Sequence, residues 1–405
     1  RGPDPGSARW TLRDRVMNGD GRSPLALYIH VPFCVRRCHY CDFAVTRSDA
    51  PPVNEWLTCI ARDLAEWSEE LDTGGPLRLD TIFVGGGTPS LLGGAGMESL
   101  AELLAGHFEW DSERLEWTAE ANPGSLTPET ARRWRALGLN RLSIGVQSFD
   151  DRALKWLGRL HDSAEANRAV ERAHDAGFEN VSVDLIFGLP GDVTRNWKQD
   201  LERATSLGVT HVSAYGLTAE PRTPLGRLVT NGRVEMPSED RYADEYATTV
   251  KVLNEHNLKQ YEVSNFALDG YECRHNWHYW IGSEYLGLGP SAHSLVAGQR
   301  IWNVTDWQAY RDAATSGASV REGRETPGRA DRRLESLWLG LRTRNGIELA
   351  AHGIQADLVD HWVAEDWASV SDGVLRLTAE GWLRLDGLVA ELDSRLTTSH
   401  DQSEQ

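Results

Sequence analysis

Residues 28–43 read Tyr28-Ile-His-Val-Pro-Phe-Cys34-Val-Arg-Arg-Cys38-His-Tyr-Cys41-Asp-Phe43. Three cysteines with the spacing C-x3-C-x2-C follow directly on an apolar run that begins at Leu25. Because a closed 4Fe-4S cluster needs four thiolates, three cysteines can hold such a cluster and leave one iron open to an exchangeable ligand. The spacing alone also leaves open a zinc site with His30 or His39 as its fourth ligand.

The composition limits the class of protein. The 405 residues include five cysteines, and this odd, clustered set indicates metal ligation in a reducing compartment rather than a disulfide framework. A formal net charge of −18 argues against nucleic acid as a partner. No run reaches ~18 apolar residues, and Arg1 to Trp10 lacks the apolar stretch of a secretion signal. We therefore expect a cytoplasmic protein that is not integral to a membrane.

Short apolar runs alternate with helical windows between Leu25 and Phe266. Six strands are predicted, at Leu25 to His30, Thr81 to Val84, Glu116 to Ala121, Arg141 to Gln147, Val181 to Phe187 and His211 to Leu217. Repeated strand-helix units predict an α/β fold with a parallel sheet, either open or curled into a barrel. Glycines and polar residues gather where these strands end, which is the edge at which such folds place their sites.

The pattern changes after residue 296. A helix carrying Leu334, Leu337 and Leu341, a helix near Asp357 to Ser369, a strand at Val374 to Leu377 and a helix from Ala379 to Leu392 follow in turn. This order predicts a small winged-helix-like α+β domain over residues 297–395, after a core over residues 25–296. Seven arginines against fourteen Asp and Glu from residue 331 onward favour a structural or lid role over DNA binding. Residues 1–24 and 396–405 are predicted to be flexible.

The cysteine segment, together with Gly85-Gly86-Gly87-Thr88-Pro89, resembles the radical S-adenosylmethionine (radical SAM) superfamily. Within it, the chain is similar to the oxygen-independent coproporphyrinogen III oxidase group from about Leu25 to Leu392. The resemblance implies a partial (β/α)6 TIM-type barrel. It also implies that Cys34, Cys38 and Cys41 hold a 4Fe-4S cluster whose open iron is chelated by S-adenosylmethionine, which is then cleaved to a 5′-deoxyadenosyl radical.

The same resemblance implies a set of S-adenosylmethionine contacts. Glycines allow a close backbone approach to a ligand, and a carboxylate suits an ammonium group or a ribose hydroxyl. Asp184 points to a ligand site independently, because a carboxylate inside an apolar strand is unfavourable without a partner. The implied contacts are Tyr28, Tyr40, Gly86, Gly87, Thr88, Glu120, Gln147, Arg159 and Asp184.

Two branches of the group differ at one position of the cluster segment. The oxidases typically carry a further cysteine two residues after the third, where this chain has Phe43. The HemW-like heme chaperones resemble this chain at Cys41-Asp-Phe43 and in a second motif, His275-Asn276-Trp277-His278-Tyr279-Trp280, within a segment near 261–296. Taken alone, such an aromatic stretch would more often pack in a core. With the resemblance, His275, Asn276, Tyr279 and Trp280 become heme-binding candidates.

Several secondary assignments remain. Histidine is a common axial ligand of heme iron, so His275 is the first choice, with His278 and His293 behind it and Cys273 ranked lower. Cys59 is predicted to be a core residue, and His30 is predicted to orient the cysteine loop rather than bind metal.

The leading functional hypothesis is a heme chaperone with a radical SAM core that binds heme and passes it to an acceptor hemoprotein, such as a respiratory protein at a membrane. The alternative is an oxygen-independent coproporphyrinogen III oxidase, and the weakest reading is a zinc-stabilised binding module. The sequence leaves a monomer and a dimer equally open.

Overall fold

The computed structural model describes residues 25–71, 76–191 and 193–403. The N-terminal segment 1–24, predicted to be flexible, lies outside the described residues.

Six parallel strands form the centre of the molecule and lie side by side in their order along the chain. They are β1 (Leu25–Val31), β4 (Leu77–Gly86), β6 (Glu116–Ala121), β7 (Arg141–Gln147), β8 (Asn180–Phe187) and β9 (His211–Gly216). All six predicted strands are therefore confirmed. The first strand, β1, and the last, β9, do not pair with each other, because each has another neighbour on its outer side. The sheet is a partial barrel, as the resemblance implied.

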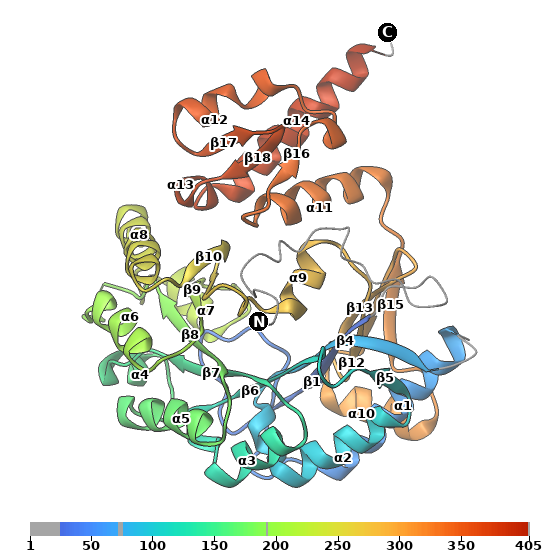
Figure 1. Ribbon diagram of the computed structural model, residues 1–405. Coiled ribbons are helices and arrows are strands. Elements are labelled where there is room, and N and C mark those ends of the chain that lie inside the picture. Colours follow the sequence, from blue (N-terminus) through green and yellow to red (C-terminus); the bar gives the residue numbers. More distant parts are fainter. Residues whose placement is uncertain (1–24, 72–75, 192, 404–405) are drawn as a thin grey trace, which may run out of the picture.

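Helices cover the convex face of this curved sheet (Figure 1). They are α1 (Val53–Leu71), α2 (Gly93–Ala105), α3 (Pro128–Ala136), α4 (Asp151–Trp156), α5 (Ser163–Asp175), α6 (Trp197–Ser206) and α8 (Glu239–Glu255). Helix α1 shows why these helices pack on the sheet. Its apolar side chains recur at three- and four-residue steps and are buried against the sheet, as for Trp56, Ile60 and Leu64. Cys59 lies on the same face with no exposed surface, which confirms its prediction as a core residue.

Shorter elements complete the barrel and carry the loops at its rim. They are β2 (Phe33–Cys34), β3 (Thr46–Arg47), β5 (Phe108–Trp110), α7 (Pro224–Thr230), β10 (Lys259–Glu262), β11 (Asn265–Ala267) and α9 (Arg274–Trp280), with 3-10 turns at Pro89–Leu92 and Pro123–Ser125. Strands β11 and β10 extend the sheet beyond β9. Helix α9 lies on the concave side of the sheet, beneath α11 (Arg329–Leu341) (Figure 1).

The large sheet continues past the domain boundary expected at residue 297, and that expectation is corrected. Strand β12 (Tyr285–Leu288) pairs in parallel with β1, and β13 (His293–Val296), β14 (Gln299–Asn303) and β15 (Arg321–Glu325) follow as antiparallel neighbours. Helix α10 (Trp307–Ser316) packs against α1, with Trp307 and Tyr310 buried. The barrel unit therefore reaches Glu325.

A buried carboxylate explains why this extension belongs to the barrel. Asp63 of α1 accepts hydrogen bonds from Gly289 N at 2.9 Å, Asn303 Nδ2 at 2.7 Å and Tyr310 Oη at 2.9 Å. Arg321 adds an ion pair at 2.7 Å, and the side chains of Asp63 and Arg321 are 0% and 9% exposed. The Asp63 side chain thus connects α1 to β14, α10 and β15. Hydrophobic periodicity in the sequence cannot predict such a long-range contact.

Asp63→Ala is expected to lower the free energy of unfolding by roughly 3–5 kcal/mol, because it leaves the enclosed Arg321 guanidinium with only the longer ion pair to Glu66, at 3.9 Å. Urea denaturation measures the loss. Asp312→Ala removes a carboxylate whose side chain is 61% exposed and should change stability by no more than ~0.5 kcal/mol. Equal losses in the two variants would contradict the role assigned to Asp63.

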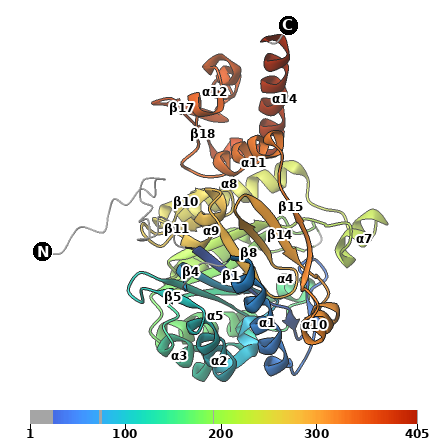
Figure 2. The same cartoon turned by 90° about the vertical axis from the view of Figure 1, so that its right-hand side faces the viewer.

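The C-terminal unit stands apart from the barrel, with α11 facing the barrel and α14 (Leu385–Ser403) extending away from it (Figure 2). Its three-stranded antiparallel sheet has the order β16 (Ile347–Glu348), β18 (Val374–Leu377), β17 (Ala368–Ser371). The remaining pieces are α12 (Asp360–Ala364), α13 (Ala379–Trp382) and 3-10 turns at Ala350–His352 and Ala356–Val359. The winged-helix-like assignment stays a prediction.

One expectation for this unit is corrected. The helix expected near Asp357 to Ser369 ends early, because Asp366 adopts φ 58° and the chain then enters β17. The tail expected to be flexible from residue 396 belongs to α14 as far as Ser403, and its flexibility stays a prediction; residues 404–405 lie outside the description. Residues 397–403 contain no glycine or proline to stop the helix that begins at Leu385.

Candidate functional site: the cysteine loop and the barrel interior

The three clustered cysteines lie on the loop that follows β1. Strand β2 pairs in parallel with β3, which ties the two ends of this loop together. Cys34 Sγ is 3.3 Å from Thr88 Oγ1, and Cys41 N donates to Cys38 O at 3.2 Å. The loop therefore meets the glycine-rich end of β4, as the order of motifs in the sequence predicted.

Two glycines allow these segments to approach each other. Gly86 has φ 107°, and a Cβ placed on it would lie 2.5 Å from the His30 ring. A Cβ on Gly87 would lie 2.7 Å from Phe33 O and 2.8 Å from Val31 O. Since those oxygens belong to the backbone, no side chain fits at Gly87 without moving the start of the cysteine loop.

The ligand set fits a cluster better than a single zinc ion. Within the described ranges, no three His, Cys, Asp or Glu side chains converge closely enough to hold one metal ion. His30 uses both ring nitrogens, at 3.0 Å from Tyr28 Oη and 2.9 Å from Ala44 O, and His39 packs on Trp156 with ring centroids 4.7 Å apart. A cluster instead binds each thiolate at a separate iron. The contacts of His30 agree with its predicted role of orienting the loop.

The thiols also need positive charge beside them in order to ionise. Burial raises the pKa of Cys34 to about 11 and raises that of Cys41 as well. Arg159 Nη1 lies 3.6 Å from Cys38 Sγ, while its Nη2 donates to Gly145 O at 2.9 Å and its buried Nε has no partner. Tyr40 lies beside the same guanidinium. Iron and Arg159 together would supply the positive charge that three thiolates require.

Two carboxyl groups face the barrel interior without an ion pair among the residues that the structure describes. Glu120 Oε2 accepts from Gly86 N at 3.0 Å, and Asp184 Oδ1 accepts from Ser143 Oγ at 3.1 Å. Burial and the nearby Asp184 raise the pKa of Glu120 to about 8, and burial raises the pKa of Asp184. Such a pair is suited to a cationic ligand, because an added positive charge would favour both ionised forms.

Gln147 ends β7 with φ 70°, and the register between β7 and β8 shifts just before it. A non-glycine residue in the left-handed region is strained, and such strain collects at ligand sites. The Gln147 amide lies beside Gly145, which also accepts from Arg159. The structure thus brings Gln147, Arg159, Glu120, Asp184, Gly86, Gly87 and Thr88 to one end of the barrel with the cysteine loop.

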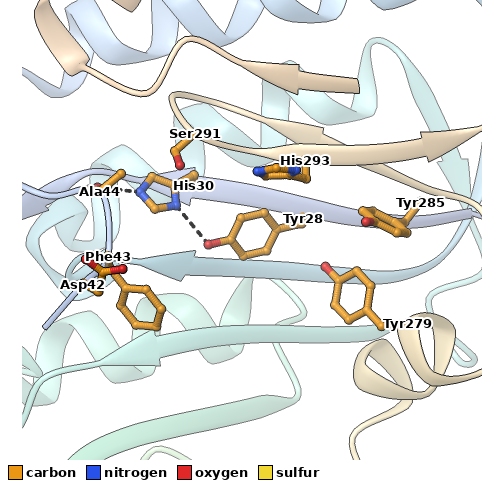
Figure 3. A pocket seen from close by; sticks show the side chains of 9 residues that line it. All are labelled: Tyr28, His30, Asp42, Phe43, Ala44, Tyr279, Tyr285, Ser291 and His293. Atoms are coloured by element: carbon orange, nitrogen blue, oxygen red, sulfur yellow. Dashed lines mark hydrogen bonds between the residues drawn. The ribbon is translucent and has the colours of Figure 1, made fainter. Parts of the chain in front are cut away.

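A cavity of about 350 Å³ adjoins this end of the barrel. Its lining is rich in aromatic rings, and Figure 3 shows Tyr28 near its middle, between His30 on one side and the pair Tyr279 and Tyr285 on the other. The lining residues are Tyr28, His30, Asp42, Phe43, Ala44, Tyr279, Tyr285, Ser291 and His293. Phe43 is 63% exposed and stands at the rim. The residue that distinguishes the two branches of the group therefore faces this cavity.

Comparisons with known proteins identify the family. The model of the radical SAM superfamily matches residues 28–204. The heme chaperone HemW of Bacillus subtilis (strain 168) is 37% identical over 321 residues, which cover 79% of this chain and 84% of that relative. The HemW of Mycobacterium tuberculosis (strain H37Rv) is 35% identical over 373 residues, covering 91% and 95%. This chain belongs to the HemW family of radical SAM proteins.

A solved structure supports the fold of this HemW-family chain. The coproporphyrinogen III oxidase HemN of Escherichia coli, described as a radical SAM enzyme, aligns with a TM-score of 0.77 at 19% identity and covers 92% of this chain and 90% of its own. At 19% identity, the similarity to this oxidase supports the fold of the chain and not its activity. A separate finding is that none of the helices in the described ranges is long and apolar enough to cross a membrane.

The second motif of the HemW-family chain lies in α9, at the amino ends of the barrel strands. Glu116, the first residue of β6, accepts from Arg274 N and His275 N, both at 3.0 Å. His275 has no exposed surface. Its Nδ1 lies 2.8 Å from Thr81 Oγ1, and its Nε2 lies 2.9 Å from Tyr279 Oη. Both ring nitrogens are thus engaged within the core, and the choice of His275 as heme ligand stays a prediction.

The other members of this motif take different places. Tyr279 lines the cavity, whereas Asn276 and Trp280 do not. Trp280 lies under the Arg342 guanidinium, with 4.0 Å from its ring centroid to Arg342 Cζ. His278 Nε2 pairs with Asp80 Oδ2 at 2.9 Å. The motif thus contributes one cavity residue and otherwise packs α9 between the barrel and the C-terminal unit.

Sequence reasoning did not single out Tyr285 or Ser291 as cavity residues, and it ranked His293 behind His275 as a heme ligand. A signal was present in the run Gly287-Leu288-Gly289-Pro290-Ser291, since glycines close to a proline mark a tightly constrained turn. Ser291 adopts φ 61°, and a Cβ on Gly289 would lie 2.6 Å from His30 O. This turn packs directly on β1 and so places the next residues beside Tyr28.

Proposed function

We propose that this chain is a heme chaperone built on a radical SAM core, which binds heme and transfers it to an acceptor protein. The observation that carries the proposal is the aromatic cavity beside the cysteine loop, lined by Tyr28, Tyr279 and Tyr285 with Phe43 at its rim. A porphyrin is a flat, largely apolar disc, and aromatic rings offer it large contact areas. The relatives from Bacillus subtilis and Mycobacterium tuberculosis, which are 37% and 35% identical to this chain, carry the name heme chaperone HemW.

Cys34, Cys38 and Cys41 would hold the 4Fe-4S cluster. The carboxyl groups of Glu120 and Asp184 would receive a cationic ligand at the same end of the barrel, next to the backbone of Gly86 and Gly87. When bound there, S-adenosylmethionine supplies a reducible sulfonium group. The chain itself orients the cysteine loop through His30, shields it with Thr88, and balances the thiolate charge with Arg159.

Phe43 favours the chaperone over the oxidase. The oxidase branch typically carries a cysteine at this position, and here the side chain is an exposed phenyl ring at the rim of the cavity. A phenyl ring can add contact area for a porphyrin but no thiol chemistry. The acceptor is proposed to be a hemoprotein, and a respiratory protein at a membrane is one candidate.

Hemin titration of the anaerobically purified, full-length protein tests the proposal. We expect a saturable Soret band with about one heme per chain, because the aromatic rings line a single cavity. In the same preparation, coproporphyrinogen III with S-adenosylmethionine and a reductant should give no protoporphyrinogen IX. Turnover of that substrate would establish the oxidase instead, and stoichiometric zinc without iron would establish the zinc-stabilised module.

A further inference from the structure

A groove of about 680 Å³ lies where the C-terminal unit meets the barrel. Helices α11 and α14 supply one side of this junction groove, and the last two strands of the large sheet, β14 and β15, supply the other, beneath α11 (Figure 2). Arg300 of β14 joins the two sides, because its guanidinium pairs with Glu325 at 2.9 Å and with Glu335 of α11 at 2.6 Å. Contacts from both units therefore hold the groove in shape.

Helix α11 presents an apolar ridge to the junction groove. Its residues Leu337 and Leu341 have no exposed surface and belong to the core. Leu334 and Trp338 are four residues apart, so they share one face of the helix, and both line the groove; Leu334 is 41% exposed. Val389 of α14 lies in the same lining. An exposed apolar ridge beside a second helix is a surface on which the apolar face of a third helix can dock.

The charged side chains around this ridge are mainly acidic. Four carboxylates and a single guanidinium, that of Arg300, line the groove. Asp331 accepts from Gly328 N at 3.0 Å and Asp386 accepts from Trp338 Nε1 at 2.8 Å, and neither carboxylate forms an ion pair with another residue of the described ranges. Because both residues are exposed, their negative charges are available to a cationic partner.

Two other occupants fit this surface less well. A second copy of the chain carries a formal net charge of −18, so an acidic groove repels it. An added strand would pair with the outer edge of β15, but this strand reads Arg-Glu-Gly-Arg-Glu and Pro327 follows it after one residue. Charges and proline at a sheet edge oppose such pairing. A helix that is both basic and amphipathic matches the ridge and the carboxylates together.

We propose that the junction groove binds a basic amphipathic helix of a partner protein. The apolar side chains of that helix pack on Leu334 and Trp338, and its lysines or arginines lie beside Asp331 and Asp386. The identification of this partner as the heme acceptor rests on the function proposed above.

The position of the groove suits an acceptor. Tyr285, which lines the aromatic cavity, pairs with Leu295 of β13, and Leu295 pairs with Arg300 of β14. Neighbouring strands are about 4.8 Å apart, so the backbones of Tyr285 and Arg300 are separated by about 10 Å. A partner seated in the junction groove therefore lies next to the cavity from which heme would be passed.

Fluorescence anisotropy with the full-length protein, before any heme is added, tests the groove. The probe is a labelled synthetic peptide of about 18 residues, or about five helical turns, with leucines along one helical face and lysine elsewhere. We expect saturable binding that weakens as NaCl is raised from about 50 to 500 mM. Leu334→Ser and the double variant Asp331→Asn/Asp386→Asn should each weaken binding at least ~10-fold. The same peptide with glutamate in place of lysine should not bind.

Two control variants separate the groove from the general acidity of the chain. Val363 is 43% exposed on α12 and lies outside the groove, so Val363→Ser is the match for Leu334→Ser. Asp357→Asn/Asp372→Asn removes two charges from exposed positions of the same unit. Both controls should bind the peptide as the wild type does. Equal weakening in the groove and control variants would overturn the proposal, because it would show a non-specific attraction of cations.

The remaining outcomes are distinct. A dimer that Leu334→Ser dissociates, without peptide binding, would assign the groove to a second copy of the chain and overturn the proposal. Absent peptide binding beside a normal hemin titration would overturn the groove alone. Peptide binding by a protein that takes up no heme would support the groove and overturn the heme-chaperone function, and with it the identification of the partner as a heme acceptor.

Discussion

Replacing Cys38 by serine is expected to abolish the iron-sulfur cluster. The proposed cluster would have three protein thiolates, and a serine hydroxyl does not ionise at neutral pH to replace the third. Cys38 Sγ also lies 3.6 Å from Arg159 Nη1. The substitution therefore removes the thiolate whose negative charge this guanidinium would balance. After anaerobic reconstitution, iron and inorganic sulfide should fall from about four of each per chain to background. The visible absorption of the cluster should disappear with them.

Cys59→Ala is the matched control for this variant. Cys59 is a buried residue of α1 with no exposed surface and lies outside the cysteine loop, so its removal should leave the iron content unchanged. Wild-type iron in Cys38→Ser would show that this cysteine is not a ligand. One zinc per chain in the wild type, lost in Cys38→Ser, would instead favour the zinc site that the spacing alone leaves open.

The sequence could predict the barrel because its strands are strongly patterned. The strand β1 is a largely apolar buried run, β6 and β7 alternate polar with apolar residues, and amphipathic helices lie between the strands along the chain. Their predicted bounds match the structure to within a residue for β1 and at both ends for β6 and β7. The end of the barrel unit was predicted too early, because β13 to β15 are short antiparallel strands and their attachment depends on Asp63, more than 220 positions before Asn303 and Arg321 in the chain.

The heme-binding candidates show a second limit of prediction from the sequence. His275 belongs to a recognisable motif, but its ring nitrogens are engaged by Thr81, 194 residues earlier, and by Tyr279. No local pattern reports the first of these contacts. Such contacts appear only in the folded arrangement. The motif contributes Tyr279 to the cavity, and the ranking of its histidines as heme ligands stays a prediction.

Glu120→Gln is expected to weaken binding of S-adenosylmethionine by roughly 10- to 100-fold, because it removes a carboxylate that a cationic ligand would pair with, a contact worth about 1.5–3 kcal/mol. Isothermal titration of the protein with its cluster measures the change. Asp184 remains in the variant, so binding should be weakened and not abolished. Glu129→Gln, in which the original side chain is 73% exposed, is the matched control and should bind as the wild type does.

The pH dependence separates this explanation from a general loss of structure. Without ligand, the pKa of Glu120 is raised to about 8, so the folded protein retains this proton more firmly than the unfolded chain. The wild-type unfolding free energy should therefore decline relative to Glu120→Gln as pH rises from about 4.5 to 8, and the difference should be constant above 8.

The ratio of wild-type to variant ligand affinity should rise over pH 7 to 9, as the carboxyl ionises. A ratio that does not change with pH would mean that Glu120 does not pair with a cationic group of the ligand.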